Sequence, residues 1–372
     1  MAIGKAFWAY YIRGGGEVCL PGTAQDRRNL GVFSFGPRPH RGFGNGADRI
    51  FGPAGRPKKE SMSPTWDLWR ALMRGLRKAN NRRVGLCPPA QPRRKVVGVE
   101  DLVASLCAAK PFVAGKIGGA ELMALEYQDH WIRPGWPKSW SWRRPAARLM
   151  NNAGFFPLKK GPFDRWQQTM RLAIASTDFL CAWQTDPFLR AYEEGLIGDL
   201  APGSRDITID KLGLPLVPAL LPFRWLVVSP FVMSIGRQLP RLREVHDPKG
   251  VIEGSWGQPA KTCQLVRCPF QSHLEPSPYP SWEEGLERLS QDVSKVEFDV
   301  ALIGAGAWSL PLASRIKASG RSAIHLGGQT QLMFGIKGSR WESYGIYNDS
   351  WVTADPSEIP ANRDRVEQGC YW

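Results

Sequence analysis

Two hydrophobic patterns alternate along this chain between about residues 112 and 336. Short unbroken apolar runs are typical of parallel strands that are buried on both faces. Between them lie longer stretches in which apolar residues recur every three or four positions, as on one face of a helix. This alternation predicts an α/β fold, a Rossmann-like and mostly parallel sheet with helices on both faces. The predicted strands are 112–117, 179–183, 224–228, 263–268, 300–303 and 322–326, and the predicted helices are 120–130, 163–176, 188–200, 235–245 with a kink at Pro240, 281–296 and 310–318.

The stretch from Phe298 to Trp341 carries the strongest indication of a ligand site. Its first strand runs into a turn containing Gly304 and Gly306, and Ser309 is expected to cap the helix that follows. The second strand ends at His325, which precedes Gly327 and Gly328. A dinucleotide-binding unit would have an acidic residue at that strand end, so NAD binding is disfavoured. Glycine turns after parallel strands still suit a diphosphate.

A second glycine turn, Lys116-Ile117-Gly118-Gly119-Ala120-Glu121, follows the strand over 112–117. Two interpretations of Glu121 remain open. Its carboxylate belongs either to a ligand site at the sheet edge or simply to the first turn of a helix, where it stabilises the helix dipole. The strand over 224–228 ends at Ser229, which we add to the candidate ligand contacts.

Two more polar groups complete the candidates. Trp136 and Trp140 alternate with cations that include Arg143, and tryptophan faces beside cations hold sugars, bases or headgroups, or else pack a loop onto its domain. The polar turn at Asn151 and Asn152 is expected to reach the same cleft. Near His325, which could otherwise be structural, we expect a polar pocket formed with Gln329, Lys337 and Arg340. Because parallel strands end at one edge of a sheet, all these groups are expected to converge.

The formal charge of +15 is concentrated at the start of the chain. Residues 1–100 hold 19 Lys and Arg against 6 Asp and Glu, whereas the rest holds 30 against 28. A uniformly basic nucleic-acid-binding domain is therefore disfavoured, and no specific nucleic acid is expected as a partner. We predict a disordered Gly/Pro/Arg-rich extension over 1–62, a basic amphipathic helix (Trp66 to Lys78) with a linker over 63–95, and the α/β domain over 96–372. The helix either attaches to an anionic membrane surface or docks on the domain.

Cysteine usage and hydropathy bear on the location of the protein. The seven cysteines are scattered without a Cys-x-x-Cys pair, which disfavours a zinc ribbon or redox dithiol and fits the reducing cytoplasm. Cys263 and Cys268 are interpreted as buried free thiols rather than as a metal pair. The chain shows neither a spanning apolar run nor a secretion signal. We therefore expect a cytoplasmic protein, either free or attached peripherally at the inner face of the membrane.

Taken together, the two glycine turns resemble those of bacterial proteins with the GT-D glycosyltransferase fold. The resemblance rests on the turn at 116–122 and on Asp299-Val300-Ala301-Leu302-Ile303-Gly304-Ala305-Gly306, His325-Leu326-Gly327-Gly328 and Leu332-Met333-Phe334-Gly335-Ile336-Lys337-Gly338-x-Arg340-Trp341. It extends from about residue 110 to the end of the chain. It implies a GT-D-like sheet and the transfer of a sugar from a nucleotide-sugar donor to a glycan or cell-envelope acceptor in polysaccharide biosynthesis.

In that family the turn that corresponds to residues 116–121 usually reads Arg-Ile-Gly-Asp-Gly-Glu, and its Asp-x-Glu pair is associated with a divalent metal and the sugar nucleotide. The matching positions here are Lys116, Gly119 and Glu121, so one carboxylate is missing. Either Glu121 and the diphosphate hold Mn²⁺ or Mg²⁺, or cations such as Lys337 and Arg340 neutralise the leaving group instead. The alternative is a non-catalytic sugar-nucleotide or glycan-binding scaffold protein. Together, the residue patterns and the resemblance lead us to expect these roles: catalysis for Glu121 and His325; donor binding for Lys116, Gly118, Gly119, Ser229, Gly304, Gly306, Ser309, Gly327, Gly328, Gln329, Lys337 and Arg340; and acceptor binding for Trp136, Trp140, Arg143, Asn151 and Asn152.

Overall fold

The computed structural model describes residues 94–132, 142–185, 187–208, 213–248, 263–269 and 277–372. The predicted extension over 1–62 and all but the last two residues of the segment over 63–95 lie outside these ranges, as do Trp136 and Trp140.

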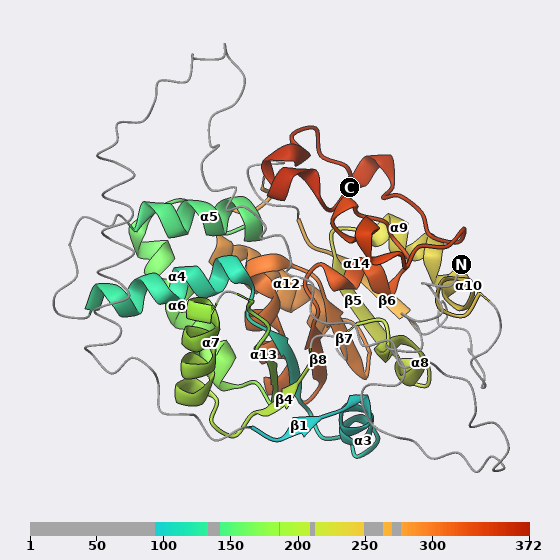
Figure 1. Ribbon diagram of the computed structural model, residues 1–372, viewed down its shortest axis with the longest axis horizontal. Helices are drawn as coiled ribbons and strands as arrows, with labels where there is room; N and C mark the ends of the chain where they lie inside the picture. Colours follow the sequence, from blue (N-terminus) through green and yellow to red (C-terminus); the bar gives the residue numbers. More distant parts are fainter. Residues whose placement is uncertain (1–93, 133–141, 186, 209–212, 249–262, 270–276) are drawn as a thin grey trace, which may run out of the picture. The chain divides into compact units, whose positions relative to one another are not determined.

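Eight strands form one sheet at the centre of the described structure (Figure 1). Their order is β1-β4-β3-β2-β8-β7-β5-β6, and neighbouring strands are parallel throughout. This confirms the predicted α/β class and the parallel sheet. The strands are β1 (Val96–Val97), β2 (Val113–Lys116), β3 (Phe179–Cys181), β4 (Arg205–Ile207), β5 (Trp225–Ser229), β6 (Cys263–Arg267), β7 (Val300–Ile303) and β8 (Ser322–His325).

Helices connect the strands and cover both faces of the sheet. At Pro240 one helix with a kink was predicted, but a short 3-10 turn, Leu239–Arg241, separates two helices there, because proline lacks an N–H and clashes with the preceding turn. The helices are α3 (Val99–Cys107), α4 (Gly119–Ile132), α5 (Arg143–Ala153), α6 (Lys160–Ala175), α7 (Pro187–Leu200), α8 (Leu216–Leu220), α9 (Val232–Gln238), α10 (Leu242–His246), α12 (Trp282–Ser294), α13 (Ser309–Ala318) and α14 (Gln329–Met333).

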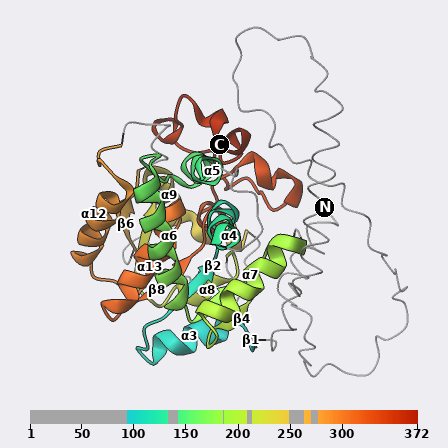
Figure 2. The ribbon, with the colours of Figure 1, turned by 90° about the vertical axis from the view of Figure 1, so that its left-hand side faces the viewer.

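Alternate residues of each central strand enter different core layers. In β5, Leu226 and Val228 pack with the helices from α4 to α7, α12 and α13, while Trp225 and Val227 pack with α8, α9 and the chain after β8. Figure 2 shows α6, α12 and α13 together on the first of these faces. Burial on both faces explains why the strands are apolar runs rather than alternating patterns.

Helix α5 corrects one local prediction. Asn151 and Asn152 were expected in a polar turn, but they occupy the last turn of α5, which ends at Gly154 in the left-handed conformation with φ of 82°. The helix forms because Ala146, Leu149 and Ala153 share one buried face.

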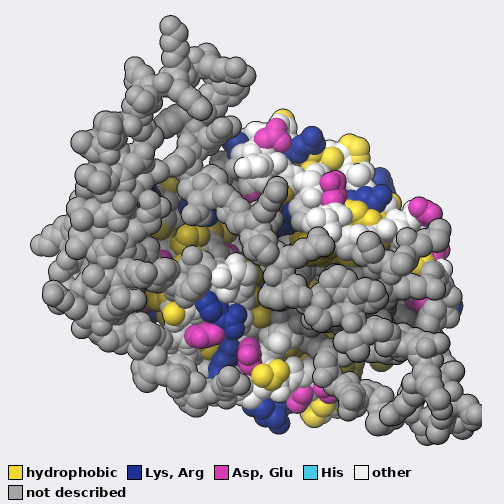
Figure 3. Space-filling view, viewed as in Figure 1, with side chains coloured by type: hydrophobic (Ala, Val, Ile, Leu, Met, Phe, Trp, Pro, Cys, Tyr) yellow, Lys and Arg dark blue, Asp and Glu magenta, His cyan; other side chains and the backbone are white. Residues whose placement is uncertain are grey.

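The described surface carries charges of both signs. Figure 3 shows lysine and arginine side chains interspersed with aspartate and glutamate, in keeping with the near balance of charges after residue 100. Among the described helices, none combines the length and apolar character that crossing a membrane requires.

Candidate functional site

The two central strands, β2 and β8, bring Lys116 and His325 together at the carboxyl edge of the sheet. Each residue is the last of its strand, and the strands are neighbours. Gly327 lies between their side chains: a Cβ at this position would be 3.8 Å from Lys116 Nζ and 3.7 Å from His325 Cε1. Gly327 also has a φ of +58°, which favours glycine. The absence of a side chain at Gly327 therefore leaves space next to an amine and an imidazole.

The Lys116 amine faces an aromatic ring rather than a carboxylate. Its Nζ lies 4.0 Å from the centroid of the Trp183 ring. Lys116 takes part in none of the ion pairs formed among the described residues. Burial lowers the pKa of Lys116, while the charges of Glu121 and Glu367 oppose this effect. An anionic group bound beside this amine would oppose the effect of burial and favour its charged form.

His325 is a neutral polar group at this edge. Burial and the Lys116 charge lower the pKa of His325 to about 3. Its Nδ1 lies 3.4 Å from the Ile303 carbonyl oxygen, and we assign the ring proton to Nδ1 on that basis. Nε2 is then an acceptor, so His325 can receive a hydrogen bond from a hydroxyl but adds no positive charge.

Glu121 lies in the first turn of α4 and folds back over Gly118. A Cβ at Gly118 would overlap the Glu121 carboxylate, so this glycine makes room for it. Burial raises the pKa of Glu121, whereas its own backbone N–H and the Lys116 charge favour the ionised form. The carboxylate thus lies at the helix N-terminus and within electrostatic reach of Lys116, while its part in a ligand site stays a prediction.

The described residues do not fit a divalent cation at this turn. Gly119 supplies no side-chain oxygen, and no group of three His, Cys, Asp or Glu suitable for a metal occurs in the part of the chain that the structure describes. Hard cations gather six or more oxygen ligands. The predicted Mn²⁺ or Mg²⁺ site therefore lacks a donor set among these residues.

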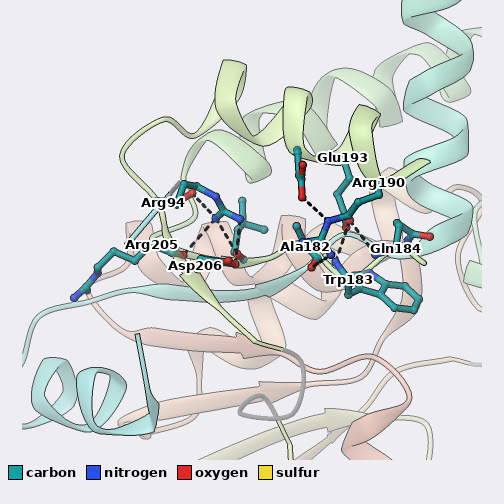
Figure 4. Close-up of polar contacts among 11 residues, drawn as sticks. Arg94, Ala182, Trp183, Gln184, Arg190, Glu193, Arg205 and Asp206 are labelled. Carbon is teal, nitrogen blue, oxygen red and sulfur yellow. Dashed lines mark hydrogen bonds and ion pairs between the residues drawn. The ribbon is translucent and has the colours of Figure 1, made fainter. Parts of the chain in front are cut away.

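Glu193 of α7 belongs to this edge, although the sequence reasoning did not select it. Its Oε2 accepts hydrogen bonds from the backbone N–H groups of Trp183 and Gln184, each at 3.0 Å (Figure 4). Trp183 Nε1 in turn donates to the Ile117 carbonyl oxygen at 2.7 Å. One signal was present in the sequence, since Glu193 falls on the apolar face of its helix between Leu189 and the buried Leu196.

The turn after β7, which contains Gly304 and Gly306, forms its contacts with other parts of the protein. The Gly304 N–H donates to the Val228 carbonyl oxygen at 2.9 Å, and the Ala305 N–H donates to Ser309 Oγ at 2.9 Å. Gly306, with φ of +53°, packs against the Ala153 carbonyl group. Ser309 is the first residue of α13 rather than its N-cap. Ligand contacts by Gly304, Gly306 and Ser309 stay predictions, and so does that by Ser229, whose Oγ accepts from the Phe231 N–H at 3.1 Å.

The C-terminal residues cover the turn after β8, which contains Gly327 and Gly328. A Cβ at Gly328 would be 2.9 Å from the Tyr371 ring and 3.2 Å from the Trp341 ring. Arg340 donates to the Tyr371 hydroxyl at 2.8 Å and pairs with Glu367 at 3.2 Å.

The other described residues that were predicted to bind a ligand lie in α14, in the segment that follows it and in α5. Gln329 begins α14, directly after Gly327 and Gly328. Lys337 is half-buried, and its backbone N–H donates to the Val352 carbonyl oxygen. Asn151 reaches the C-terminal segment, where its Nδ2 donates to the Arg365 carbonyl oxygen at 2.6 Å. Asn152 lies beside it, one residue before the Ala153 that touches Gly306. Arg143 lies exposed at the opposite end of α5.

Comparisons with known proteins give a resemblance among solved structures. No family model and no curated protein matches the chain. A structure described as a new glycosyltransferase (DUF1792) from Streptococcus sanguinis has a TM-score of 0.41 and 10% identity, covering 72% of this chain and 96% of that one. A selenomethionine-substituted DUF1792 structure has a TM-score of 0.36. A third DUF1792 structure, described as having a distinct glycosyltransferase fold, has a TM-score of 0.35. Both are 11% identical in sequence to this chain, and each match covers 72% of this chain and 93% of the other. At these values the similarity does not assign the chain to that family.

Proposed function

We propose that the protein is a glycosyltransferase that binds a nucleotide-sugar donor at the carboxyl edge of β2 and β8. The observation that carries the proposal is the convergence of Lys116 and His325 on Gly327. Ligands of parallel α/β sheets bind at this edge, and the Lys116 amine, which forms no ion pair with another described residue, suits a diphosphate. The sequence motifs and the names of the structural neighbours point to the same class of reaction.

In glycosyl transfer, the bond between the anomeric carbon and the donor's diphosphate oxygen breaks, and the electron pair leaves with the diphosphate. The acceptor oxygen forms the new bond, and its proton passes to water or to the released diphosphate. Lys116 would stabilise the charge that develops on the diphosphate, since a preformed cation in a partly buried site acts strongly on such charge. His325 would accept a hydrogen bond from a sugar hydroxyl, and Glu121 would orient the donor through Lys116.

A second candidate is a non-catalytic protein that binds a sugar nucleotide or glycan during polysaccharide assembly. Gly119 favours this alternative, because the turn has one carboxylate where the resemblance would place two. The neutral His325 favours it as well, since a group with a pKa of about 3 is a weak base.

Turnover separates the two candidates. Purified full-length protein is incubated with a panel of nucleotide sugars, with Mn²⁺, with Mg²⁺ and with a chelator, and the released nucleoside diphosphate is measured together with the melting temperature. We expect at least one donor to raise the melting temperature and to be hydrolysed or transferred. Stabilisation without turnover would favour the binding protein, and if no donor has either effect the proposal fails. Full activity of a Glu121→Gln variant would remove Glu121 from the mechanism.

A further inference from the structure

The loop between β3 and α7 borders the ligand site, and a buried carboxylate holds it there. Trp183 and Gln184 follow β3, and both of their backbone N–H groups donate to Oε2 of Glu193. Glu193 has no solvent exposure. Figure 4 shows these contacts, with Arg190 of the same helix donating to the Ala182 carbonyl oxygen.

Both side chains of this loop reach the turn after β2, which contains Gly118 and Gly119. The Trp183 ring lies under the Lys116 amine, 4.0 Å from Nζ, and its Nε1 bonds to the Ile117 carbonyl oxygen. The Gln184 amide nitrogen would be 3.7 Å from a Cβ at Gly119. The position of the loop therefore sets the surroundings of the amine to which we assign the ligand.

Glu193 Oε1 and Gln184 Nε2 are buried and make no hydrogen bond within the described part of the chain. A buried carboxylate that uses one of its two oxygens is an unfavourable choice for stability, because its desolvation is only partly offset. An apolar residue would suit this helix face better. The unfavourable desolvation of the Glu193 carboxylate is therefore consistent with a role in holding the loop rather than in stabilising the fold.

We propose that Glu193 is a positioning residue of the ligand site, which fixes Trp183 and Gln184 so that the tryptophan ring stays against the Lys116 amine. The identity of the ligand rests on the proposed function, whereas the anchoring of the loop does not.

The charge state of Glu193 provides a distinctive readout. Burial raises the pKa of Glu193 to about 7, opposed by the two N–H bonds and by Arg190, while Glu194 adds to the rise. The Cys181 thiol of β3 interacts electrostatically with Glu193, and burial raises the pKa of Cys181 to about 12. Above a pH of about 7 the two bonds are charge-assisted, and below it they are weaker neutral bonds.

Hydrogen exchange tests the anchoring without any ligand. We expect the Trp183 and Gln184 amides to exchange faster in Glu193→Ala than in the wild type, and Glu193→Gln, whose carbonyl oxygen still accepts, to restore part of the protection. Glu194→Gln is the matched control, since Glu194 is the neighbouring acid and pairs with Arg190 instead. Unchanged exchange in both Glu193 variants would overturn the proposal.

Ligand affinity against pH tests the effect on the site, with inorganic pyrophosphate and the common nucleoside diphosphates as probes. Between about pH 8 and about pH 6 we expect the wild-type affinity to fall roughly fivefold relative to that of Glu193→Gln, as the two bonds lose their charge assistance. Phosphate titration affects both proteins alike, and so does Lys116, whose lowered pKa means that it gains charge as the pH falls, which acts in the opposite direction to the expected loss of affinity. A wild type that binds with the same pH profile as Glu193→Gln overturns this inference alone. A wild type that binds none of the probes overturns the proposed function as well.

Discussion

At the scale of single residues, two glycines with positive φ allow the effect of backbone strain to be distinguished from the effect of filling the proposed ligand space. Gly327 has a φ of +58° and lies between Lys116 and His325, whereas Gly320 has a φ of +85° and nothing within 4 Å of its would-be Cβ. Alanine at either position would be strained by about 1–2 kcal/mol. At Gly327 the new methyl group would also fill the space that we assign to the ligand.

We therefore predict that Gly327→Ala and Gly320→Ala lose similar stability, but that Gly327→Ala alone weakens ligand binding. Urea unfolding measures the first effect, and titration with a nucleoside diphosphate measures the second. Equal affinities in the two variants would show that the space at Gly327 is not used.

The raised pKa of Glu193 makes the free energy of unfolding decrease as the pH rises. A carboxyl group whose pKa is raised on folding, here to about 7, contributes stability that is present below its unfolded value and lost as pH rises through the folded value. Between about pH 5 and about pH 8 we expect the unfolding free energy of the wild type to fall by roughly 3 kcal/mol relative to Glu193→Gln. Urea unfolding across this range measures the difference. A constant difference would contradict the assignment, and Glu194→Gln should show little change.

At the scale of elements, helix α9 depends on a residue that comes much later in the chain. The buried Glu358 accepts hydrogen bonds from the Met233 N–H at 2.6 Å, the Ser234 N–H at 3.1 Å and the Ser234 hydroxyl at 2.5 Å. It therefore satisfies the N-terminus of a seven-residue helix that lacks a side-chain cap of its own. The C-terminal segment thus stabilises the helix that follows β5.

Removing this cap should be costly for folding. We expect Glu358→Ala to lower the unfolding free energy by roughly 3 kcal/mol, since buried N–H and hydroxyl groups lose their acceptor. The exposed Glu342 gives the control variant Glu342→Ala, which should be nearly neutral. Chemical denaturation compares them, and similar losses would show that Glu358 does not act as a cap.

At the scale of the whole molecule, the basic N-terminal segment and the α/β domain have different charge. The described structure begins with Arg94, whose guanidinium donates to the Leu180 carbonyl oxygen at 2.8 Å and pairs with Asp206 at 3.2 Å (Figure 4). A deletion that leaves the contacts of the α/β domain intact should therefore remove residues 1–93 and retain Arg94.

We predict that this truncated chain keeps the melting temperature and ligand affinity of the full chain but loses most of its binding to polyanions and to anionic vesicles. Heparin chromatography and vesicle sedimentation over a range of salt concentrations measure this loss, because interactions between exposed charges are screened by salt. Unchanged polyanion binding would place the relevant cations within the α/β domain.

The sequence predicted the parts of the fold that have a strong local pattern. Buried strands such as β5 and β7 and helices such as α6 and α12 follow from their apolar spacing, and the meeting of Lys116 with His325 follows from parallel strand ends. The edge strand β1 and its neighbour β4 have two and three residues, too few for a periodic signal. The roles of Glu193 and Glu358 depend on backbone groups distant in sequence, and the packing of Gly306 against Ala153 depends on where α5 lies. Such tertiary contacts have no local sequence signature.

Calorimetric titration of Lys116→Met with a nucleoside diphosphate, in the presence of a chelator, tests the central claim most directly. Methionine keeps most of the side-chain volume and removes the charge, and Lys110→Met is the control because Lys110 is exposed just before the same strand. We predict at least a roughly tenfold loss of affinity for Lys116→Met, as expected when a charged hydrogen-bond donor is removed from a partly buried anion site, and no loss for Lys110→Met. Equal affinity of the wild type and Lys116→Met would contradict the placement of the ligand at the carboxyl edge of β2 and β8.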